Sequence, residues 1–403
     1  MTQSADILIV GAGPAGLALA LQQARRGRSV LLLERAGLPR DKVCGEGVMP
    51  LGLDVLAELG VNAEAIPGSP FDGLDYRTRR QATALRLRPG RTGRGMRRTA
   101  LLAHLQVQAL AQPGVTLQPA HVQGPLWEGR RIVGARSHGV AYRGRVVVAA
   151  DGVNSPMARG AGVPLRRSGY RMGLRQHFTR PAGPLPRVAV GLFPPHDVYL
   201  TPVGGETFLA TTMTDRAGYD AIRGDYGAFL KAGEFGDWFA GAAPVSPVLG
   251  WSHPLFTPGH YAPGGMLLVG DAGGGIDPCL GMGISLALLS ARLADAAIAG
   301  VLAQPAAGAR HVAEYHAARR ALQRHYGGFD RVFRALVASP RGSELLVWGM
   351  RHWPQVADTL LEIVAERHAW RTFKWSQLLR PVLRGVGRGG GRLHAPGGAP
   401  PVG

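Results

Sequence analysis

The sequence predicts an α/β fold built on a Rossmann-type dinucleotide-binding unit. Residues 6–10 and 29–33 are short apolar runs typical of buried parallel strands, and residues 17–26 between them have a helical pattern. The glycine-rich turn GAGPAG at residues 11–16 connects the first run to the helix. A strand, a glycine turn, a helix and a second strand in this order form one βαβ unit.

The glycines of this turn have the spacing that a pyrophosphate needs. Gly11 permits the tight turn, Gly13 lets the phosphates approach the backbone, and Gly16 lets the helix pack closely on the strand. The helix N-terminus adds free N–H groups and the positive end of its dipole. Glu34 follows the second strand and is expected to accept hydrogen bonds from an adenosine ribose, while its charge disfavours a 2′-phosphate. NAD and FAD remain as candidates.

Further strands with polar turns follow along the chain. A helix is expected to begin at Arg98, and residues 146–150 form a buried strand that ends in Asp151 and Gly152.

A last strand again leads to a glycine turn and a helix. Residues 266–269 form this strand, which ends in Gly270 and Asp271. The stretch PCLGMG at residues 278–283 then opens a long apolar helix over residues 284–302. The N-terminus of that helix is a second site that favours negative charge.

The order of these motifs resembles the para-hydroxybenzoate hydroxylase-like flavoprotein superfamily, in particular its branch of geranylgeranyl reductases and FAD-dependent monooxygenases. The resemblance runs over residues 6–302. It implies a three-layer FAD-binding domain with an inserted antiparallel substrate sheet, FAD as the cofactor, and NADPH or NADH as the reductant. The cofactor-binding residues that it implies are Gly11, Gly13, Pro14, Ala15, Gly16, Glu34, Arg35, Arg98, Asp151, Gly152, Gly270, Asp271, Pro278, Gly281, Met282 and Gly283.

The same resemblance gives these residues separate roles. The first glycine turn would hold the AMP half of FAD, and Arg98 would contact the ribityl-pyrophosphate region, with Arg97 as the alternative. Asp271 would bind the ribityl chain, and residues 278–283 would line the flavin ring. The turn at residues 151–152 would lie near the pyrophosphate and the path of NAD(P)H.

A cysteine loop lies between the second strand and the Arg98 helix. The stretch PRDKVCGEGVMP at residues 39–50 resembles the Lys-x-Cys-Gly segment that lies beside the flavin in geranylgeranyl reductase-like proteins. This implies that Cys44 is the catalytic residue and donates a proton; the alternative is a small buried side chain that shapes the pocket. Cys279 is expected near Cys44 across the ring, with a disulfide between them as the less favoured arrangement.

Composition excludes several other classes. Two cysteines cannot form a disulfide scaffold or a thiolate zinc site, and the 13 histidines lack metal-ligand spacing, so we expect no metal. The sequence has no second dinucleotide turn after a strand, no GxSxG esterase motif and no Trp-x-Trp-x-x-Pro stretch of flavin halogenases. The formal charge is +19, but no basic stripe with interleaved aromatics follows it, so we expect no nucleic-acid partner.

The chain divides into five expected segments. These are an FAD-binding part (1–169), a substrate domain (170–262), a second FAD-binding part (263–303), a helical extension (304–384) and a disordered tail (385–403). Strands are expected at residues 170–180, 196–203 and 207–213, and helices at 224–239, 311–325, 329–337, 343–352 and 355–368. His177, His196 and Tyr199 are polar candidates for the substrate pocket, with structural roles as the alternative.

The tail suggests a membrane surface. Residues 368–381 mix cations with Trp370 and Trp375, as interfacial segments do; the alternative is an ordinary packing helix. The chain opens without a signal peptide, and residues 284–302 are interrupted by two charges. We therefore expect a cytoplasmic protein that associates with the inner face of the membrane. No feature of the sequence sets its oligomeric state.

The expected reaction follows from the resemblance. We expect an oxidoreductase that hydroxylates a small apolar aromatic, quinone or lipid-like substrate, with reduction of isoprenoid or other C=C bonds as the alternative. A non-redox binding protein with a vestigial dinucleotide fold and an NAD-dependent dehydrogenase are further alternatives.

Overall fold

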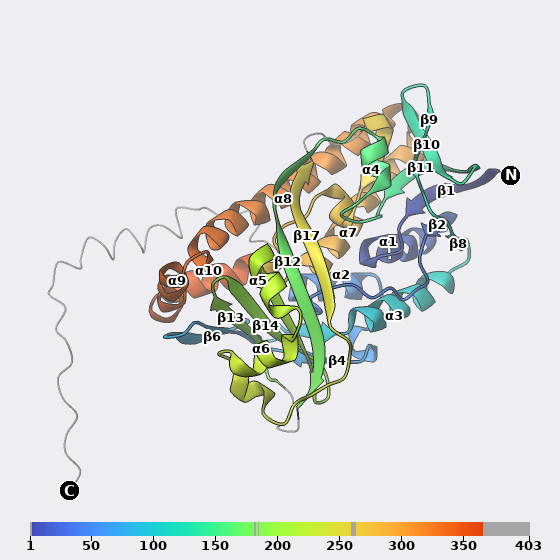
Figure 1. Ribbon diagram of the computed structural model, residues 1–403. Helices are drawn as coiled ribbons and strands as arrows, with labels where there is room; N and C mark the ends of the chain where they lie inside the picture. Colours follow the sequence, from blue (N-terminus) through green and yellow to red (C-terminus); the bar gives the residue numbers. More distant parts are fainter. Residues whose placement is uncertain (1, 181–182, 184, 259–262, 366–403) are drawn as a thin grey trace, which may run out of the picture.

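The computed structural model describes residues 2–180, 183, 185–258 and 263–365 (Figure 1). Its first sheet has seven strands in the order β8-β2-β1-β11-β10-β9, and β18 also pairs with β11. The strands are β1 (Thr2–Val10), β2 (Val30–Glu34), β8 (Val115–Pro119), β9 (Gly124–Glu128), β10 (Arg131–Ser137), β11 (Val140–Ala149) and β18 (Leu267–Leu268). Strands β8, β2, β1, β11 and β18 pair in parallel, so the turns that follow β1, β11 and β18 meet at one edge.

The predicted βαβ unit is confirmed. Helix α1 (Pro14–Ala24) begins earlier than the predicted residue 17, because Pro14 at its first turn already has the backbone angle that a helix requires. A Cβ atom on Gly16 would lie 1.9 Å from the carbonyl oxygen of Gly11, so only glycine lets α1 approach β1 this closely. This contact fixes the N-terminus of α1 at the end of β1.

Three helices pack on this sheet: α1, α3 (Arg98–Leu110) and α7 (Gly283–Ala303). Helix α2 (Pro50–Glu58) packs on α7, and the short α4 (Pro156–Gly160) packs on β9. Helix α7 is long and apolar enough to cross a membrane, but its buried face contacts α1, α2 and α8 within the core. It is therefore the core helix that carries the second glycine turn.

The substrate sheet has eight strands in the order β16-β12-β15-β14-β13-β5-β6, and β17 also pairs with β12. The strands are β5 (Gly73–Arg77), β6 (Ala82–Arg86), β12 (Leu165–Thr179), β13 (Val188–Phe193), β14 (His196–Gly204), β15 (Thr207–Thr214), β16 (Ala243–Pro244) and β17 (Leu249–Pro258). The predicted antiparallel strands are present, and the long strands β12 and β17 run side by side (Figure 1). Strands β5 and β6 come from the range 1–169 that we assigned to the FAD-binding part.

Smaller elements connect the two sheets. A three-stranded sheet contains β3 (Gly47–Val48), β4 (Gly68–Phe71) and β7 (Gly93–Met96). Helices α5 (Arg216–Ile222) and α6 (Tyr226–Ala232) cover one face of the substrate sheet. The single helix predicted over residues 224–239 is wrong, because Gly233 is extended and ends α6 before a short 3₁₀ turn at Gly236–Phe239.

The C-terminal extension is helical, with α8 (Gly308–Val337), α9 (Pro340–His352) and α10 (Pro354–Ala365). The break predicted between residues 325 and 329 is wrong. Tyr326, Phe329 and Phe333 continue one buried face at helical spacing and hold α8 together across its two glycines. The predicted interfacial segment with Trp370 and Trp375, and the tail from residue 385, lie outside the described residues.

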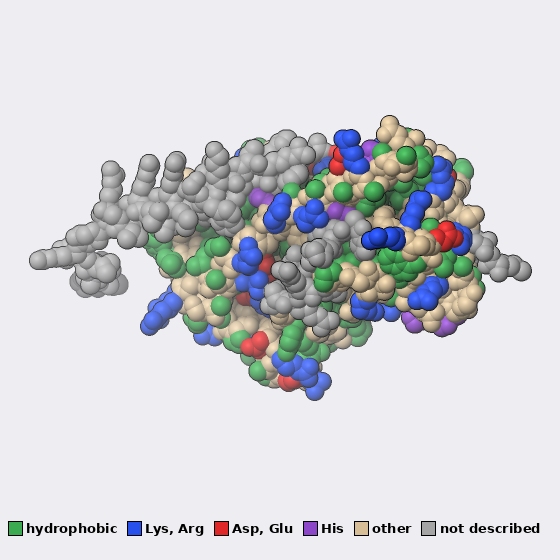
Figure 2. All heavy atoms as spheres, turned by 90° about the horizontal axis from the view of Figure 1, so that it is seen from above, with side chains coloured by type: hydrophobic (Ala, Val, Ile, Leu, Met, Phe, Trp, Pro, Cys, Tyr) green, Lys and Arg blue, Asp and Glu red, His purple; other side chains and the backbone are tan. Residues whose placement is uncertain are grey.

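The Lys and Arg side chains are spread over the surface. On the face seen in Figure 2 they lie among apolar and uncharged polar side chains rather than in one stripe. Many arginines also pair with carboxylates, as Arg91 does with Asp54 at 2.9 Å.

A pair of neighbouring substitutions tests the packing of α8. Phe333 is 2% exposed, whereas Val332 beside it is 46% exposed. Phe333→Ala should lower the free energy of unfolding by about 3–5 kcal/mol, and Val332→Ala should change it by less than about 0.5 kcal/mol. Chemical denaturation measures both; equal effects would show that α8 does not dock on the core as described.

Candidate active site

A cavity of about 690 Å³ lies between the turns of the first sheet and one face of the substrate sheet. Its wall includes both glycine turns, the Cys44 loop, the start of α3 and the turn after β11. All the predicted cofactor-binding residues except Gly16 and Met282 line the cavity. Gly16 packs α1 on β1 and Met282 is fully buried below the second turn, so these two support the site from behind.

The first glycine turn is open towards the cavity. Gly13 begins α1 without a side-chain cap, and a Cβ atom there would meet only Arg98 Nη2, 4.0 Å away. Gly11 has φ 103°, and a Cβ atom on it would lie 2.4 Å from the Ala150 carbonyl oxygen. Free N–H groups in an open cradle at a helix N-terminus fit a pyrophosphate.

Glu34 is held in place at the other end of the cradle. Its carboxylate accepts hydrogen bonds from the backbone N–H groups of Ala12 at 2.8 Å and of Arg35 at 2.9 Å. Each carboxylate oxygen can accept more than one hydrogen bond. Glu34 therefore keeps acceptor capacity for a ribose hydroxyl, and its role as a ribose ligand stays a prediction.

Two buried polar atoms in this part of the cavity lack partners among the described residues. They are Arg98 Nε and Asp151 Oδ1. Burial raises the pKa of Asp151 to about 6, although hydrogen bonds from Ser155 and the backbone of Met157 oppose this shift. The open Arg98 donor fits a phosphate oxygen of a dinucleotide, and the open Asp151 acceptor fits a sugar hydroxyl.

The second turn is built by β18, α7 and α8 together. Gly270 donates its N–H to Ser290 Oγ at 2.8 Å, and Arg319 of α8 donates to the carbonyl oxygens of Gly270 and Gly274 at 3.2 Å. Lys42 Nζ lies 3.5 Å from Asp271 Oδ2. Burial raises the pKa of Asp271, but the charges of Lys42, His253, Arg98 and Arg319 together outweigh it, so the net shift is downward and Asp271 stays ionised. The uncapped N-terminus of α7 completes this turn.

Cys44 and Cys279 both line the cavity, and both are free thiols, so the disulfide is not formed in this structure. Cys44 is half-buried, and its Sγ accepts the N–H of Glu46 at 3.4 Å. Burial raises the pKa of Cys44, with nearby Arg98 acting in the opposite direction. The thiol therefore keeps its proton at neutral pH.

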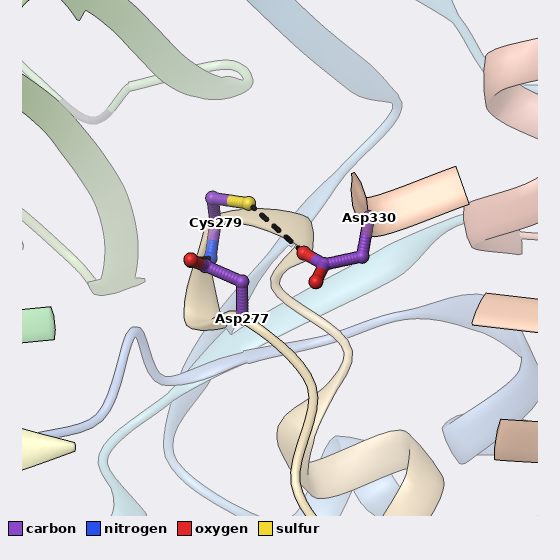
Figure 3. A group of neighbouring side chains, drawn as sticks. All are labelled: Asp277, Cys279 and Asp330. Carbon is purple, nitrogen blue, oxygen red and sulfur yellow. Dashed lines mark hydrogen bonds between the residues drawn. The ribbon is translucent and has the colours of Figure 1, made fainter. Parts of the chain in front are cut away.

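Cys279 belongs to a buried ionic cluster (Figure 3). Its thiol donates to Asp330 Oδ1 at 3.9 Å, and its N–H donates to Asp277 Oδ1 at 3.0 Å. Ligand atoms of these three residues lie within 4.8 Å of one another, a spacing that would also suit a metal ion. Arg334 Nε already lies 3.1 Å from Asp330 and 3.7 Å from Asp277, so a guanidinium supplies the positive charge. We therefore interpret the group as an ion-paired cluster.

Glu46 is a site residue that the sequence analysis missed. It is 1% exposed and has φ 55°, and its carboxylate accepts the N–H of Arg98 at 3.0 Å and lies 2.7 Å from His177 Nε2. Arg175 Nη1 can only donate to His177 Nδ1, at 2.9 Å, so Nε2 carries the proton and donates it to Glu46. In the sequence, only the glycines on both sides of Glu46 indicated an unusual backbone conformation at this residue.

The three polar candidates for the substrate pocket have different positions. His177 is buried and hydrogen-bonds to the Glu46 carboxylate, so its role is structural. His196 packs edge-on against Phe229 and does not line the cavity. Tyr199 lines the cavity. The sequence analysis also missed Arg319, which reaches the cavity from the helical extension.

Comparison with known proteins agrees with this geometry. The family described as FAD binding domain matches residues 4–326. A digeranylgeranylglycerophospholipid reductase of Methanopyrus kandleri is 30% identical over 314 residues, which cover 72% of this chain and 79% of the relative. A menaquinone reductase of Mycobacterium tuberculosis is 52% identical, but over 58 residues that make up only 14% of either chain.

Solved structures show the same fold. The flavin-dependent brominase Bmp2 superposes with a TM-score of 0.81 at 18% identity, covering 96% of this chain and all of that one. A probable FAD-dependent monooxygenase, PqsL of Pseudomonas aeruginosa, has a TM-score of 0.73 at 20% identity, covering 86% of this chain and all of that one. The predicted fold class and cofactor class are thus confirmed: the chain belongs to the FAD-binding oxidoreductases of the geranylgeranyl reductase and FAD-dependent monooxygenase type.

Proposed function

We propose that the protein is an FAD-dependent reductase that adds two hydrogens to a C=C bond of an apolar isoprenoid or quinone-like substrate. The observation that carries this proposal is the Cys44 thiol, which is protonated and lines the same cavity as the second glycine turn. The relative that matches most of the chain at 30% identity supports reduction. This reverses the order of preference that the sequence alone gave.

The two turns divide the cofactor between them in this proposal. The first glycine turn and Glu34 would hold the AMP half, with Arg98 and Asp151 beside the pyrophosphate. Asp271 would bind the ribityl chain, and residues 278–283 would lie along the ring. When bound and reduced by NADPH or NADH, FAD supplies the hydride.

Cys44 supplies the matching proton. The thiol proton would go to one carbon of the double bond when the other carbon receives the hydride, so the substrate would gain one C–H bond at each carbon. The thiolate that remains is stabilised by the charges of Arg98 and Lys42 until it takes a proton from water. The hydrogen bond from the N–H of Glu46 holds Sγ in place.

The remaining wall suits an apolar substrate. Leu74, Val188, Val190 and Met213 of the substrate sheet line the cavity. Burial of an isoprenoid or ring against these side chains would contribute about 25 cal/mol per Å² of apolar surface.

Oxygenation is the second candidate. The chain shares its fold with a probable FAD-dependent monooxygenase, and a hydroxylase would not require Cys44. The two reactions differ in whether an oxygen atom enters the product.

Product analysis under labelled dioxygen separates these reactions. Purified protein with FAD and NAD(P)H is incubated with a lipid extract of the host, and masses are compared with a sample lacking enzyme. We expect a product heavier by two hydrogens that also forms without oxygen. A product that carries one labelled oxygen atom would establish the monooxygenase instead.

Substitution of Cys44 tests the proton donor. Cys44→Ser should lower the rate of product formation by about 100-fold or more, because a hydroxyl is a much weaker acid than a thiol. Bound FAD and its anaerobic reduction by NAD(P)H should stay unchanged in this variant. Equal product formation by the variant would exclude Cys44 as the donor, and slower flavin reduction would show a positioning effect.

A charge at Gly13 tests the cradle. Gly13→Asp should lower FAD affinity by about 100-fold or more, because a carboxylate would face the pyrophosphate. The same side chain is a favourable N-cap for α1, so the melting temperature of the protein without FAD should not fall. Gly224→Asp, at an exposed glycine of the substrate sheet region, is the matched control. Full flavin absorbance in purified Gly13→Asp would contradict the assignment.

A further inference from the structure

A row of side chains crosses the face of the substrate sheet that borders the cavity. Tyr76 of β5, Val190 of β13, Tyr199 of β14 and Thr211 of β15 are direct partners of one another in the strand register. All four line the cavity. Side chains paired in this way lie side by side, with Cβ atoms about 4.5–5.5 Å apart for antiparallel neighbours such as Tyr199 and Thr211.

The two hydroxyl groups at one end of this row have no hydrogen-bond partner within the described part of the chain. They are Tyr199 Oη and Thr211 Oγ1, on side chains of residues that are 9% and 4% exposed. Buried hydroxyls are rarely left unpaired, because each loses its hydrogen bonds to water. Two neighbouring open hydroxyls at a cavity wall therefore indicate a polar ligand atom.

The opposite face of the same sheet provides a direct comparison. Thr212 follows Thr211 in β15 and so points to the other face, where its hydroxyl lies 3.0 Å from Tyr226 Oη. Tyr226 also donates to the carbonyl oxygen of Leu174 at 3.4 Å. The fold thus satisfies a tyrosine–threonine pair on the side away from the cavity and leaves the corresponding pair at the cavity open.

The surroundings indicate a neutral ligand atom. Burial, and then the nearby carboxylate of Asp197, raise the pKa of Tyr199 well above its ordinary value, so its phenol stays protonated and can donate. Asp197 pairs with Arg171 at 2.6 Å, and this ion pair already uses the nearby positive charge. The nearby carboxylate of Asp197 disfavours an anionic group at Tyr199, whereas a carbonyl oxygen can accept from both hydroxyls.

We propose that Tyr199 and Thr211 form a subsite that binds a carbonyl oxygen of a quinone-type ring. This inference rests on the proposed function for the role of the cavity. It makes that function more specific, because the subsite would favour a quinone over other apolar substrates. Tyr76 and Tyr199 stand on either side of Val190 and offer flat apolar surface for such a ring.

Binding to the oxidised FAD enzyme, without reductant, tests this subsite. The probes are 2-methyl-1,4-naphthoquinone and 2-methylnaphthalene, which share a ring system and differ in the carbonyl oxygens. Calorimetry should show that the unmodified protein binds 2-methyl-1,4-naphthoquinone more tightly than it binds 2-methylnaphthalene. Tyr199→Phe and Thr211→Val should each weaken quinone binding by about 3- to 10-fold and leave 2-methylnaphthalene unchanged.

Tyr226→Phe is the matched control, since it removes the tyrosine hydroxyl of helix α6 that contacts Thr212 on the opposite face of the same sheet. It should leave the affinity for both probes unchanged and lower the melting temperature. Tyr199→Phe should not lower the melting temperature, because its hydroxyl has no partner to lose among the residues that the structure describes. If Tyr199 had only a structural role, Tyr199→Phe would lower the melting temperature and leave quinone binding unchanged.

Two results would overturn the subsite. One is equal affinity of both probes for the unmodified protein, and the other is an equal loss for both probes in Tyr199→Phe. Because the oxidised enzyme does not turn over, this test is independent of the reaction. If quinone selectivity is found and no product gains two hydrogens, the reductase proposal fails and the subsite stands.

Discussion

The close approach of α1 to the ends of β1 and β11 is the constraint on which the site depends. Gly16 packs against the Gly11 carbonyl, and Gly11 in turn packs against Ala150, with no room for a side chain at either glycine. This contact turns the N–H groups of α1 towards the cavity and brings the Asp151 turn beside them. Parallel pairing of β11 with β18 then places the second glycine turn at the same edge. Thus one backbone contact and the parallel register together set where the cavity lies.

The helical extension is part of this site. Tyr315 and His316 of α8 hydrogen-bond to the carbonyl oxygens of Leu268 and Met266, at 2.7 and 3.0 Å. One turn further along α8, Arg319 reaches the second glycine turn. The three contacts tie α8 to β18 and to the backbone on both sides of it. The buried cluster around Asp277 and Asp330 adds a further connection from α8 to the stretch that would line the ring.

The sequence was sufficient for features that local patterns determine. The βαβ unit, the two glycine turns and three of the eight strands of the substrate sheet (β12, β14 and β15) follow from local residue patterns, and the structure contains them. Glu46 could not be identified in this way, because its role depends on His177, which is 131 residues away. The same holds for Thr211, whose open hydroxyl can be recognised only once its neighbours are known. The break expected in α8 failed because packing of Tyr326 and Phe333 outweighs the low helix propensity of two glycines.

The contacts of Arg319 also bear on the order in which the chain matures during synthesis. The first turn is complete once residues 2–34 and β11 have emerged from the ribosome, so a cradle for the adenine nucleotide can form early. The second turn lacks the guanidinium that holds its carbonyl oxygens until α8 has been made and has docked. In the proposed function, a nascent chain thus completes the turn for the AMP half before the turn that lines the ring. Completion of the second turn is in this way coupled to the docking of α8.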